Sequence, residues 1–177
     1  MKATGIVRRI DELGPIVIPK EIRRTQRIHS GDALEIFTDG KGEVVFKKYS
    51  PLAELGEPAA AYADVLARRL GCGVAVCDRE KIVAAAGAGR SELLGEPLPP
   101  ELDALLARRK LYTAPEEPLH RVALGSRWLL CAAPVLVHGD IEGGVLLPGM
   151  RRDAVPDPET IRAAATAAEF LARWMGE

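Results

Sequence analysis

A stretch with two prolines and a glycine, PLAELGEP at residues 51–58, constrains the fold of this chain more than any other feature. Proline and glycine are the strongest local breakers of regular structure. Before this stretch the apolar residues alternate as they do in strands, whereas after it helical and strand patterns follow one another. A length of 177 residues suits one large domain or two small ones. The sequence therefore predicts a first domain over residues 1–52 and a second over residues 53–177.

The first domain has the pattern of a small, β-rich unit. TGIVRRI (4–10) and IVIP (16–19) predict short strands, and PKEIRRTQR (19–27) predicts a helix that begins with proline. Residues 33–49 predict a hairpin in which DGKG forms the turn. A unit of about fifty residues buries little surface, so its size predicts that it dimerises.

The second domain mixes helices and strands, and the whole chain is therefore predicted to be of the α+β class. Helices are predicted over residues 59–70, 99–110 and 158–175, and strands fill most of the sequence between them. Asp157 is a predicted N-cap for the last helix. This helix carries two neighbouring apolar stripes, which is more than one packing surface needs. Burial against its own sheet and helix–helix association between subunits both explain that pattern.

Basic residues are concentrated at the N-terminal end of the chain. Residues 1–50 carry ten Lys/Arg and seven Asp/Glu, a net charge of +3, whereas the remaining residues carry a net charge of −4. This asymmetry predicts an anionic partner for the first domain, although a solvated charged face would also explain it. Guanidinium groups suit phosphates and guanine edges. The absence of aromatic residues from positions 1–30 argues against stacking on single strands and favours duplex DNA.

The sequence contains no catalytic or metal-binding constellation that can be defended. Its three histidines, His29, His120 and His138, lie in no recognisable motif. The glycine-rich segment GAGR (87–90) does not match a phosphate-binding fingerprint and predicts a flexible loop between a strand and a helix. We therefore expect no enzymatic activity, no catalytic residues, no bound metal and no cofactor.

The three cysteines are too few for a disulfide scaffold. Four residues separate Cys72 from Cys77, and the sequence has no second pair of ligands, so zinc binding is disfavoured. These residues and Cys131 are predicted to pack in the core as small apolar side chains. The longest mostly apolar run, Trp128–Val137, has ten residues, whereas a bilayer span needs about 20. With no signal-peptide pattern at the N-terminus, we expect a cytoplasmic protein without a membrane partner.

The residues KATGIVRRIDELGPIVIPKEIRRT and GDALEIFTDGKGEVVFKKYSP resemble the AbrB-like, swapped-hairpin DNA-binding domain of bacterial transition-state regulators. SPLAELGEPAAAYADVL, VCDRE and the terminal AAEFLARWM are similar to the two-domain sporulation regulators of this family. The resemblance implies that two chains interleave their N-terminal domains into one β-barrel. It further implies that AT-rich duplex DNA is bound by basic residues on one face of this dimer, namely Arg8, Arg9, Lys20, Arg23 and Arg24.

The resemblance implies that the second domain is GAF-like, with flanking helices that join two dimers into a homotetramer. Such domains often sense small molecules, and candidate wall residues for an unknown effector are Cys77, Trp128 and Cys131. The implied function is transcriptional regulation of sporulation genes. One departure is Pro15, which stands where the family typically has arginine. An antitoxin is the alternative, because toxin–antitoxin modules use the same barrel, but the second domain lacks the pattern of a disordered tail.

Overall fold

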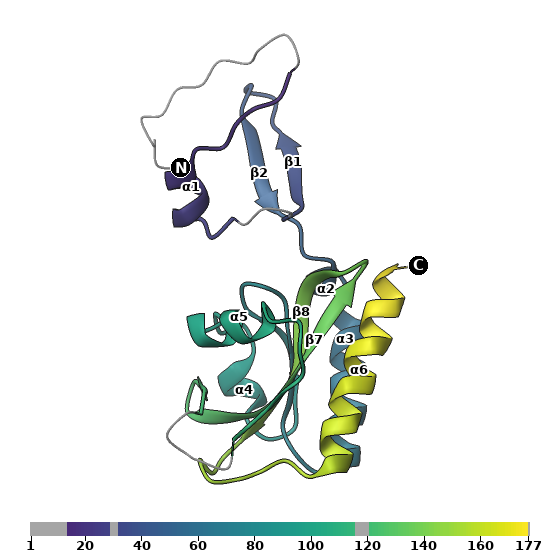
Figure 1. The fold of residues 1–177 in the computed structure, drawn as a ribbon. Coiled ribbons are helices and arrows are strands. Elements are labelled where there is room, and N and C mark those ends of the chain that lie inside the picture. Colours follow the sequence, from purple (N-terminus) through teal and green to yellow (C-terminus); the bar gives the residue numbers. More distant parts are fainter. Residues whose placement is uncertain (1–13, 29–31, 116–120, 177) are drawn as a thin grey trace. The chain divides into compact units, whose positions relative to one another are not determined.

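The computed structural model describes residues 14–28, 32–115 and 121–176, and Figure 1 shows its fold. The chain divides into two compact units, Met1–Tyr49 and Ser50–Glu177. Both units combine helices with antiparallel strands, so the predicted α+β class is confirmed.

The first unit contains a short helix and a hairpin. The helix is α1 (Lys20–Thr25), and the predicted hairpin is confirmed as β1 (Leu34–Thr38) paired with β2 (Val44–Lys48). Asp39 closes the hairpin turn, because its Oδ1 accepts hydrogen bonds from the backbone N–H groups of Lys41 (3.1 Å) and Glu43 (2.8 Å). This is the turn chemistry expected of an Asp at the head of a tight turn.

The strand predicted over residues 16–19 is wrong, because Gly14–Pro19 adopts no regular structure. A strand needs a neighbour whose backbone groups complete its hydrogen bonds. In the described part of the first unit, the only strand pairing is that of β1 with β2, and it does not include this segment. Two of its side chains remain exposed, Val17 at 73% and Ile16 at 45%. The strand predicted over residues 4–10 lies outside the described residues.

The first unit leaves most of its apolar side chains in water. Among its described residues none is buried. The register pairs Ile36 with Phe46, so both point to one face of the hairpin, and Ile36 is 61% exposed. The exposed apolar residues of this unit are Ile16, Val17, Ile36, Phe37, Val44, Phe46 and Tyr49. The described residues of this unit therefore form no core of their own.

The second unit is built on a six-stranded antiparallel sheet in the order β4-β3-β8-β7-β5, with β6 paired to β7. Its elements are α2 (Pro51–Glu54), α3 (Gly56–Leu70), β3 (Val74–Cys77), β4 (Ile82–Ala86), α4 (Arg90–Leu93), α5 (Pro100–Leu106), β5 (Tyr112–Thr113), β6 (Ala123–Leu124), β7 (Arg127–Val137), β8 (Asp140–Gly149) and α6 (Pro158–Gly176). The turn between β7 and β8 has positive φ at His138 and Gly139, as a two-residue hairpin of type I′ requires.

Helices cover both faces of this sheet. Figure 1 shows α3 and α6 on one face and α4 and α5 on the other. Along β3, Val74 and Val76 pack into the core beneath α3 and α6, whereas Ala75 and Cys77 pack into the core beneath α4 and α5. Because both faces are buried, the central strands are continuously apolar rather than alternating.

The helix ends follow the predicted capping residues. The helix predicted to end at Leu70 does so, with Gly71 in the left-handed conformation at φ 64°. Asp157 caps α6, since its Oδ1 accepts from the backbone N–H groups of Glu159 and Thr160, each at 2.9 Å. The helix predicted over 99–110 is shorter and ends at Leu106. The residues that follow it are exposed and basic, so they have no packing face to continue the helix.

The buried face of α6 lies between the two predicted stripes, from which it takes only Ala168 and Ala167, whereas Ala164 and Leu171 belong to neither. The first predicted stripe consists of Ile161, Ala165, Ala168, Ala172 and Met175, and the second of Ala163, Ala167, Phe170 and Trp174. The buried side chains of α6 are Ala164, Ala167, Ala168 and Leu171, which recur at helical spacing. Packing against the unit's own sheet is therefore confirmed for this face. Phe170 and Trp174, from one of the predicted stripes, instead remain 41% and 50% exposed.

Candidate nucleic-acid interface

The three described residues of the predicted DNA-binding set lie together on α1. Lys20, Arg23 and Arg24 occupy positions i, i+3 and i+4, which share one face of a helix, and all three are exposed. Glu21 lies in the first turn and the arginines in the last, an order that complements the helix dipole. The sequence therefore folds locally so that three cations face solvent on the same side.

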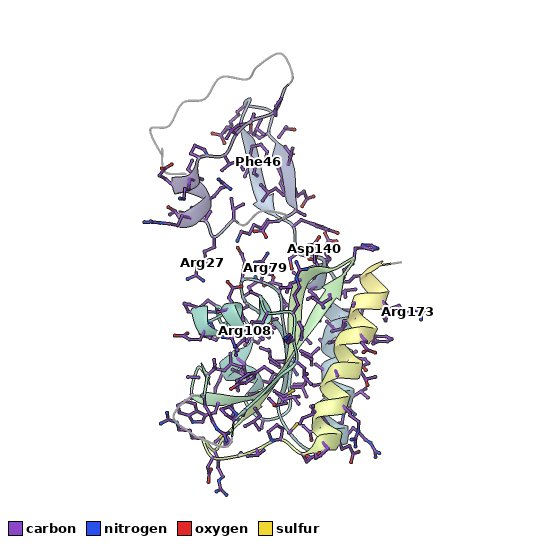
Figure 2. The ribbon with its side chains drawn as sticks, in the orientation of Figure 1. Arg27, Phe46, Arg79, Arg108, Asp140 and Arg173 are labelled. Carbon is purple, nitrogen blue, oxygen red and sulfur yellow. The ribbon has the colours of Figure 1, made fainter. Side chains whose placement is uncertain are left out.

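The C-terminal end of α1 positions a fourth basic residue. The N–H of Ile28 donates to the carbonyl of Arg23 at 2.7 Å, and the N–H of Arg27 donates to that of Arg24 at 3.3 Å. These are the two bonds of a Schellman motif, with Arg27 as the left-handed residue at φ 51°. Glycine usually occupies this position, because a side chain there costs about 1–2 kcal/mol. Figure 2 labels Arg27 just beyond the helix.

A long-range contact joins this helix end to the hairpin. The Nζ of Lys48, the last residue of β2, donates a hydrogen bond to the carbonyl oxygen of Arg27. Sequence patterns could not reveal it, because the two residues are 21 positions apart and neither lies in a motif. The contact holds the backbone of Arg27 in its strained conformation, and so fixes where α1 ends relative to β2.

The other two predicted DNA-binding residues, Arg8 and Arg9, lie outside the described residues. The structure thus brings together Lys20, Arg23 and Arg24 on α1 and places Arg27 just beyond the end of this helix. Since guanidinium and ammonium groups are natural phosphate ligands, this face of the unit can bind a polyanion.

The cysteines of the second unit are free and do not form one site. Cys77 lies in the core beneath α4 and α5, whereas Cys131 lies in the core beneath α3 and α6, on the opposite face of the sheet. Burial raises the pKa of the Cys131 thiol to about 12 and raises the pKa of Cys77 further, so both remain protonated at neutral pH. The two predicted wall residues therefore cannot line a common effector cavity.

Trp128, the third predicted wall residue, is half-buried and stacks against a guanidinium group. The Cζ of Arg152 lies 4.6 Å from the centroid of its ring. Because Cys77 and Cys131 lie on opposite faces of the sheet, Trp128 and both cysteines do not line a common site in the described part of the chain. Within the described ranges, no group of three or more His, Cys, Asp or Glu side chains is placed to hold a metal ion.

The GAGR segment has a packing role. It connects β4 to α4, and a side chain at Gly89 would overlap the guanidinium of Arg127. Arg127 is buried, and its Nε lies 3.3 Å from Oε2 of Glu92. A hydrogen bond from Ser126 and the charge of Arg127 lower the pKa of the Glu92 carboxyl. Glycine is needed here so that the backbone can approach a buried, paired arginine.

None of the helices described in the structure is both long and apolar enough to cross a membrane.

Comparison with known proteins identifies the family. Residues 54–176 match the family model described as stage V sporulation protein T C-terminal, transcription factor. Over 99% of both chains, the sequence is 41% identical to stage V sporulation protein T of Bacillus subtilis (strain 168). The chain belongs to the stage V sporulation protein T family. Membership in a family of transcription factors agrees with the predicted regulator and not with an enzyme.

The N-terminal unit has relatives of its own. Residues 7–53 match the model described as antidote-toxin recognition MazE, bacterial antitoxin. The transition state regulatory protein AbrB of Bacillus subtilis (strain 168) is 57% identical over 51 residues, which cover 29% of this chain and 52% of that protein. The predicted resemblance to AbrB-like regulators is thereby confirmed.

Solved structures resemble the second unit in fold. The type II free methionine-R-sulfoxide reductase of Thermoplasma acidophilum matches with a TM-score of 0.54 at 15% identity, covering 70% of this chain and 94% of the reductase chain. The cofactor-binding GAF domain of the nutrient sensor CodY from Clostridium difficile matches with a TM-score of 0.47 at 13% identity, covering 64% of this chain and 81% of that domain.

Proposed function

We propose that this protein is a DNA-binding transcription regulator of sporulation genes. It binds AT-rich duplex DNA through Arg8, Arg9, Lys20, Arg23 and Arg24. The observation that carries the proposal is the exposed basic face of α1 in a unit whose sequence is 57% identical to part of a transition state regulatory protein. Such a regulator acts in the cytoplasm, where its DNA lies, and needs no cofactor.

Two chains form the DNA-binding unit in this proposal. The exposed apolar face that contains Ile36 and Phe46, together with the exposed side chains of Ile16 and Val17, supports an intertwined, swapped-hairpin dimer. A partner's strands would complete the backbone hydrogen bonds around Ile16 and Val17 and cover the hairpin. Two-fold symmetry would also double the number of basic residues that face the DNA.

Two such dimers associate through the outer surface of α3 and α6. Tyr62 of α3 stacks on Phe170 of α6 with ring centroids 4.8 Å apart, and Phe170 meets Trp174 edge-to-face at 5.4 Å. These three residues form an aromatic ridge. Phe170 and Trp174 are exposed on the ridge, as is the neighbouring Val65 at 62%. Large exposed aromatic groups are typical of protein interfaces, which supports a homotetramer.

The second unit, as a GAF-like domain, would respond to an effector in this proposal. We propose a small molecule as the effector and leave its chemical class open. In a tetramer, each effector-dependent change would act on two linked DNA-binding dimers, which raises the effective affinity for neighbouring sites.

A salt titration tests DNA binding. If about 6–8 phosphates are neutralised, the logarithm of the association constant should fall against log salt with a slope of about −5 to −7. Arg23→Ala combined with Arg24→Ala should weaken binding to an AT-rich duplex and make the slope shallower by about one unit per lost phosphate contact. Fluorescence anisotropy across salt concentrations measures both quantities.

The matched control removes two positive charges from the second unit. Arg108→Ala combined with Lys110→Ala changes two exposed basic residues that follow the end of α5. Equal loss of affinity in both double variants would show a nonspecific response to net charge. A flat salt dependence of the wild-type protein would contradict the proposal altogether.

An antitoxin-like protein-interaction module is the second candidate, favoured by the match of residues 7–53 to the MazE model. An antitoxin tail that wraps a toxin is disordered until it binds. In this chain residues 50–115 and 121–176 instead form a sheet with a buried core on each face. Limited proteolysis separates the two candidates: because the folded second unit begins at Ser50, the regulator predicts a stable C-terminal fragment that begins near residue 50, whereas a tail would be degraded.

A further inference from the structure

One arginine of the second unit is buried without a carboxylate partner. Arg121 is 7% exposed, and none of the described carboxylates forms an ion pair with it. The other buried arginine among the described residues, Arg127, has Glu92 as its ion partner at 3.3 Å. Burying a charge is unfavourable unless an opposite charge compensates it. The guanidinium of Arg121 therefore lacks the counter-charge that its surroundings require.

Two hydrogen bonds tie Arg121 to the backbone around it but do not neutralise it. Its Nη2 donates to the carbonyl of Pro115 at 2.7 Å, and its Nη1 donates to the carbonyl of Ala154. These bonds join the segment after β5 to the segment before α6. The neutral amide of a glutamine also carries two donors and could serve two carbonyls. Joining the two segments therefore does not by itself explain why a charge is buried here.

Asp153 is near enough to Arg121 to respond to its charge, but another arginine already binds it. The carboxylate of Asp153 accepts hydrogen bonds from Nε (3.0 Å) and Nη2 (2.6 Å) of Arg151. Bonding to Arg151 is the main reason why the pKa of the Asp153 carboxyl is lowered, and the charge of Arg121 contributes less. Arg121 is thus left without a bonded anion among the described residues.

A second unpaired polar group lies close to Arg121. The Nε of Arg121 and the hydroxyl of Tyr112 are both buried atoms without a hydrogen-bond partner in the described chain. Burial raises the pKa of the Tyr112 hydroxyl, whereas the nearby charge of Arg121 and the backbone N–H of Val122 oppose this rise. Unsatisfied buried donors are costly. Donors gathered at one place, beside a positive charge, suit an anion.

The two groups lie at an edge of the sheet. Tyr112 begins the two-residue edge strand β5, where it pairs with Ala132 of β7. Arg121 comes two residues before β6, which pairs with the same strand, β7. Tyr112 and Val122 pack against the core beneath α4 and α5. Because Tyr112 as a whole is only half-buried, a rotation of its side chain would open a path from solvent to the Nε of Arg121.

We propose that Arg121 and Tyr112 bind the carboxylate group of a small organic acid at this edge of the sheet. The Nε–H and a neighbouring Nη–H of a guanidinium form a planar fork that matches the two oxygens of a carboxylate. The hydroxyl of Tyr112 would donate a further hydrogen bond to one of these oxygens. Binding would supply the missing counter-charge and satisfy both unpaired donors. The role of this acid as the effector rests on the proposed function, whereas its binding does not.

Titration of the full chain with sodium acetate, without DNA, tests the site. Sodium chloride keeps the ionic strength constant, and the proton–nitrogen NMR signal of the Arg121 Nε–H reports on the site directly. This signal should shift saturably with acetate. Inorganic phosphate, whose tetrahedral shape does not match the planar fork, should bind more weakly. No saturable shift with acetate overturns the proposal, as does phosphate binding that is as tight as that of acetate.

Tyr112→Phe removes only the hydroxyl. Because that hydroxyl has no partner in the structure, the variant should be at least as stable as the wild type. Acetate should nevertheless bind to it about tenfold more weakly, the usual worth of a hydrogen bond to a charged group. Tyr62→Phe is the matched control, since Tyr62 of α3 packs on the opposite face of the sheet, and it should bind acetate as the wild type does. Equal affinities in the wild type and Tyr112→Phe, or equal weakening in both variants, would place acetate elsewhere and refute the site.

Anisotropy with an AT-rich duplex separates this inference from the proposed function. If the protein binds DNA but acetate does not shift the Arg121 signal, the carboxylate site alone is overturned. If acetate binds but DNA does not, the carboxylate site stands and the proposed function is overturned, together with the role of the acid as its effector.

Discussion

Pro15 is exposed and precedes α1 on the segment where transition-state regulators typically carry arginine. Its ring fixes φ but supplies no charge. The neighbouring cations, Arg23, Arg24 and Arg27, are arranged by helix spacing and by the Schellman end of α1. At the scale of single residues, this protein therefore concentrates its described basic groups on the helix and leaves the preceding loop neutral.

Restoring a charge at this position should strengthen DNA binding. We expect Pro15→Arg to tighten binding to an AT-rich duplex by about 1 kcal/mol, the usual worth of one such contact. Pro15→Ala is the matched control, because it removes the ring without adding charge. Anisotropy at low salt measures both, and equal affinities for wild type and Pro15→Arg would show that residue 15 does not face the DNA.

Among the elements, α6 shows most clearly which features local sequence determines and which features packing determines. Asp157 starts the helix by accepting two backbone N–H groups and the hydroxyl of Thr160. Packing of small residues such as Ala164 and Ala168 then brings the helix close to β7 and β8. The start is specified by one residue, whereas the buried face is specified by what lies opposite it.

The Asp157 cap makes the stability of the fold depend on pH in the acidic range. The hydrogen bond from Thr160, with those from backbone N–H groups, lowers the pKa of Asp157. The cap therefore stabilises the fold fully above the carboxyl's ordinary pKa and loses this effect as pH falls through the lowered one. Asp157→Ala should lower the thermal midpoint at neutral pH by about 2–4 °C.

The thermal midpoints of the wild type and of Asp157→Ala should converge as the pH falls into the range where the wild-type carboxyl is protonated. Thermal unfolding across pH measures this difference, and Asp157→Asn is the control because its side-chain oxygen still caps without titrating. A gap between wild type and Asp157→Ala that stays constant down to strongly acidic pH would contradict the cap as its source.

At the scale of the whole molecule, the described residues of both units include exposed apolar side chains. The first exposes its hairpin, and the second exposes the aromatic ridge of Tyr62, Phe170 and Trp174. Figure 2 shows Arg173 extending from the outer side of α6, next to Trp174 in sequence. Aromatic residues interleaved with arginine are typical of interface cores.

Removing the ridge should reduce the oligomer. If two dimers associate through the ridge as proposed, Phe170→Ala combined with Trp174→Ala should convert the proposed tetramer to dimers, because these side chains supply much of the apolar area of the ridge. Met150→Ala and Val155→Ala, two exposed apolar residues outside α6, form the control pair. Sedimentation velocity measures the mass, and an unchanged tetramer in the ridge variant would place the second interface elsewhere.

Features that depend on neighbours in sequence could be predicted. The hairpin turn at Asp39, the cap at Asp157 and the end of α3 at Gly71 each follow from contacts within a few positions. The basic face of α1 follows equally from helix spacing. The prediction of a strand over residues 16–19 was wrong because local sequence does not determine which segment would pair with it.

The amino-acid sequence by itself determined the family, the helix caps and the charge of the N-terminal unit. Only the tertiary structure decided that Cys77 and Cys131 face opposite sides of the sheet, that Lys48 holds the carbonyl of Arg27, and that Ser50 meets Asp78. The physical reason is range. Caps and turns are closed by atoms a few residues apart, whereas these contacts join residues that only the packing of the whole unit brings together.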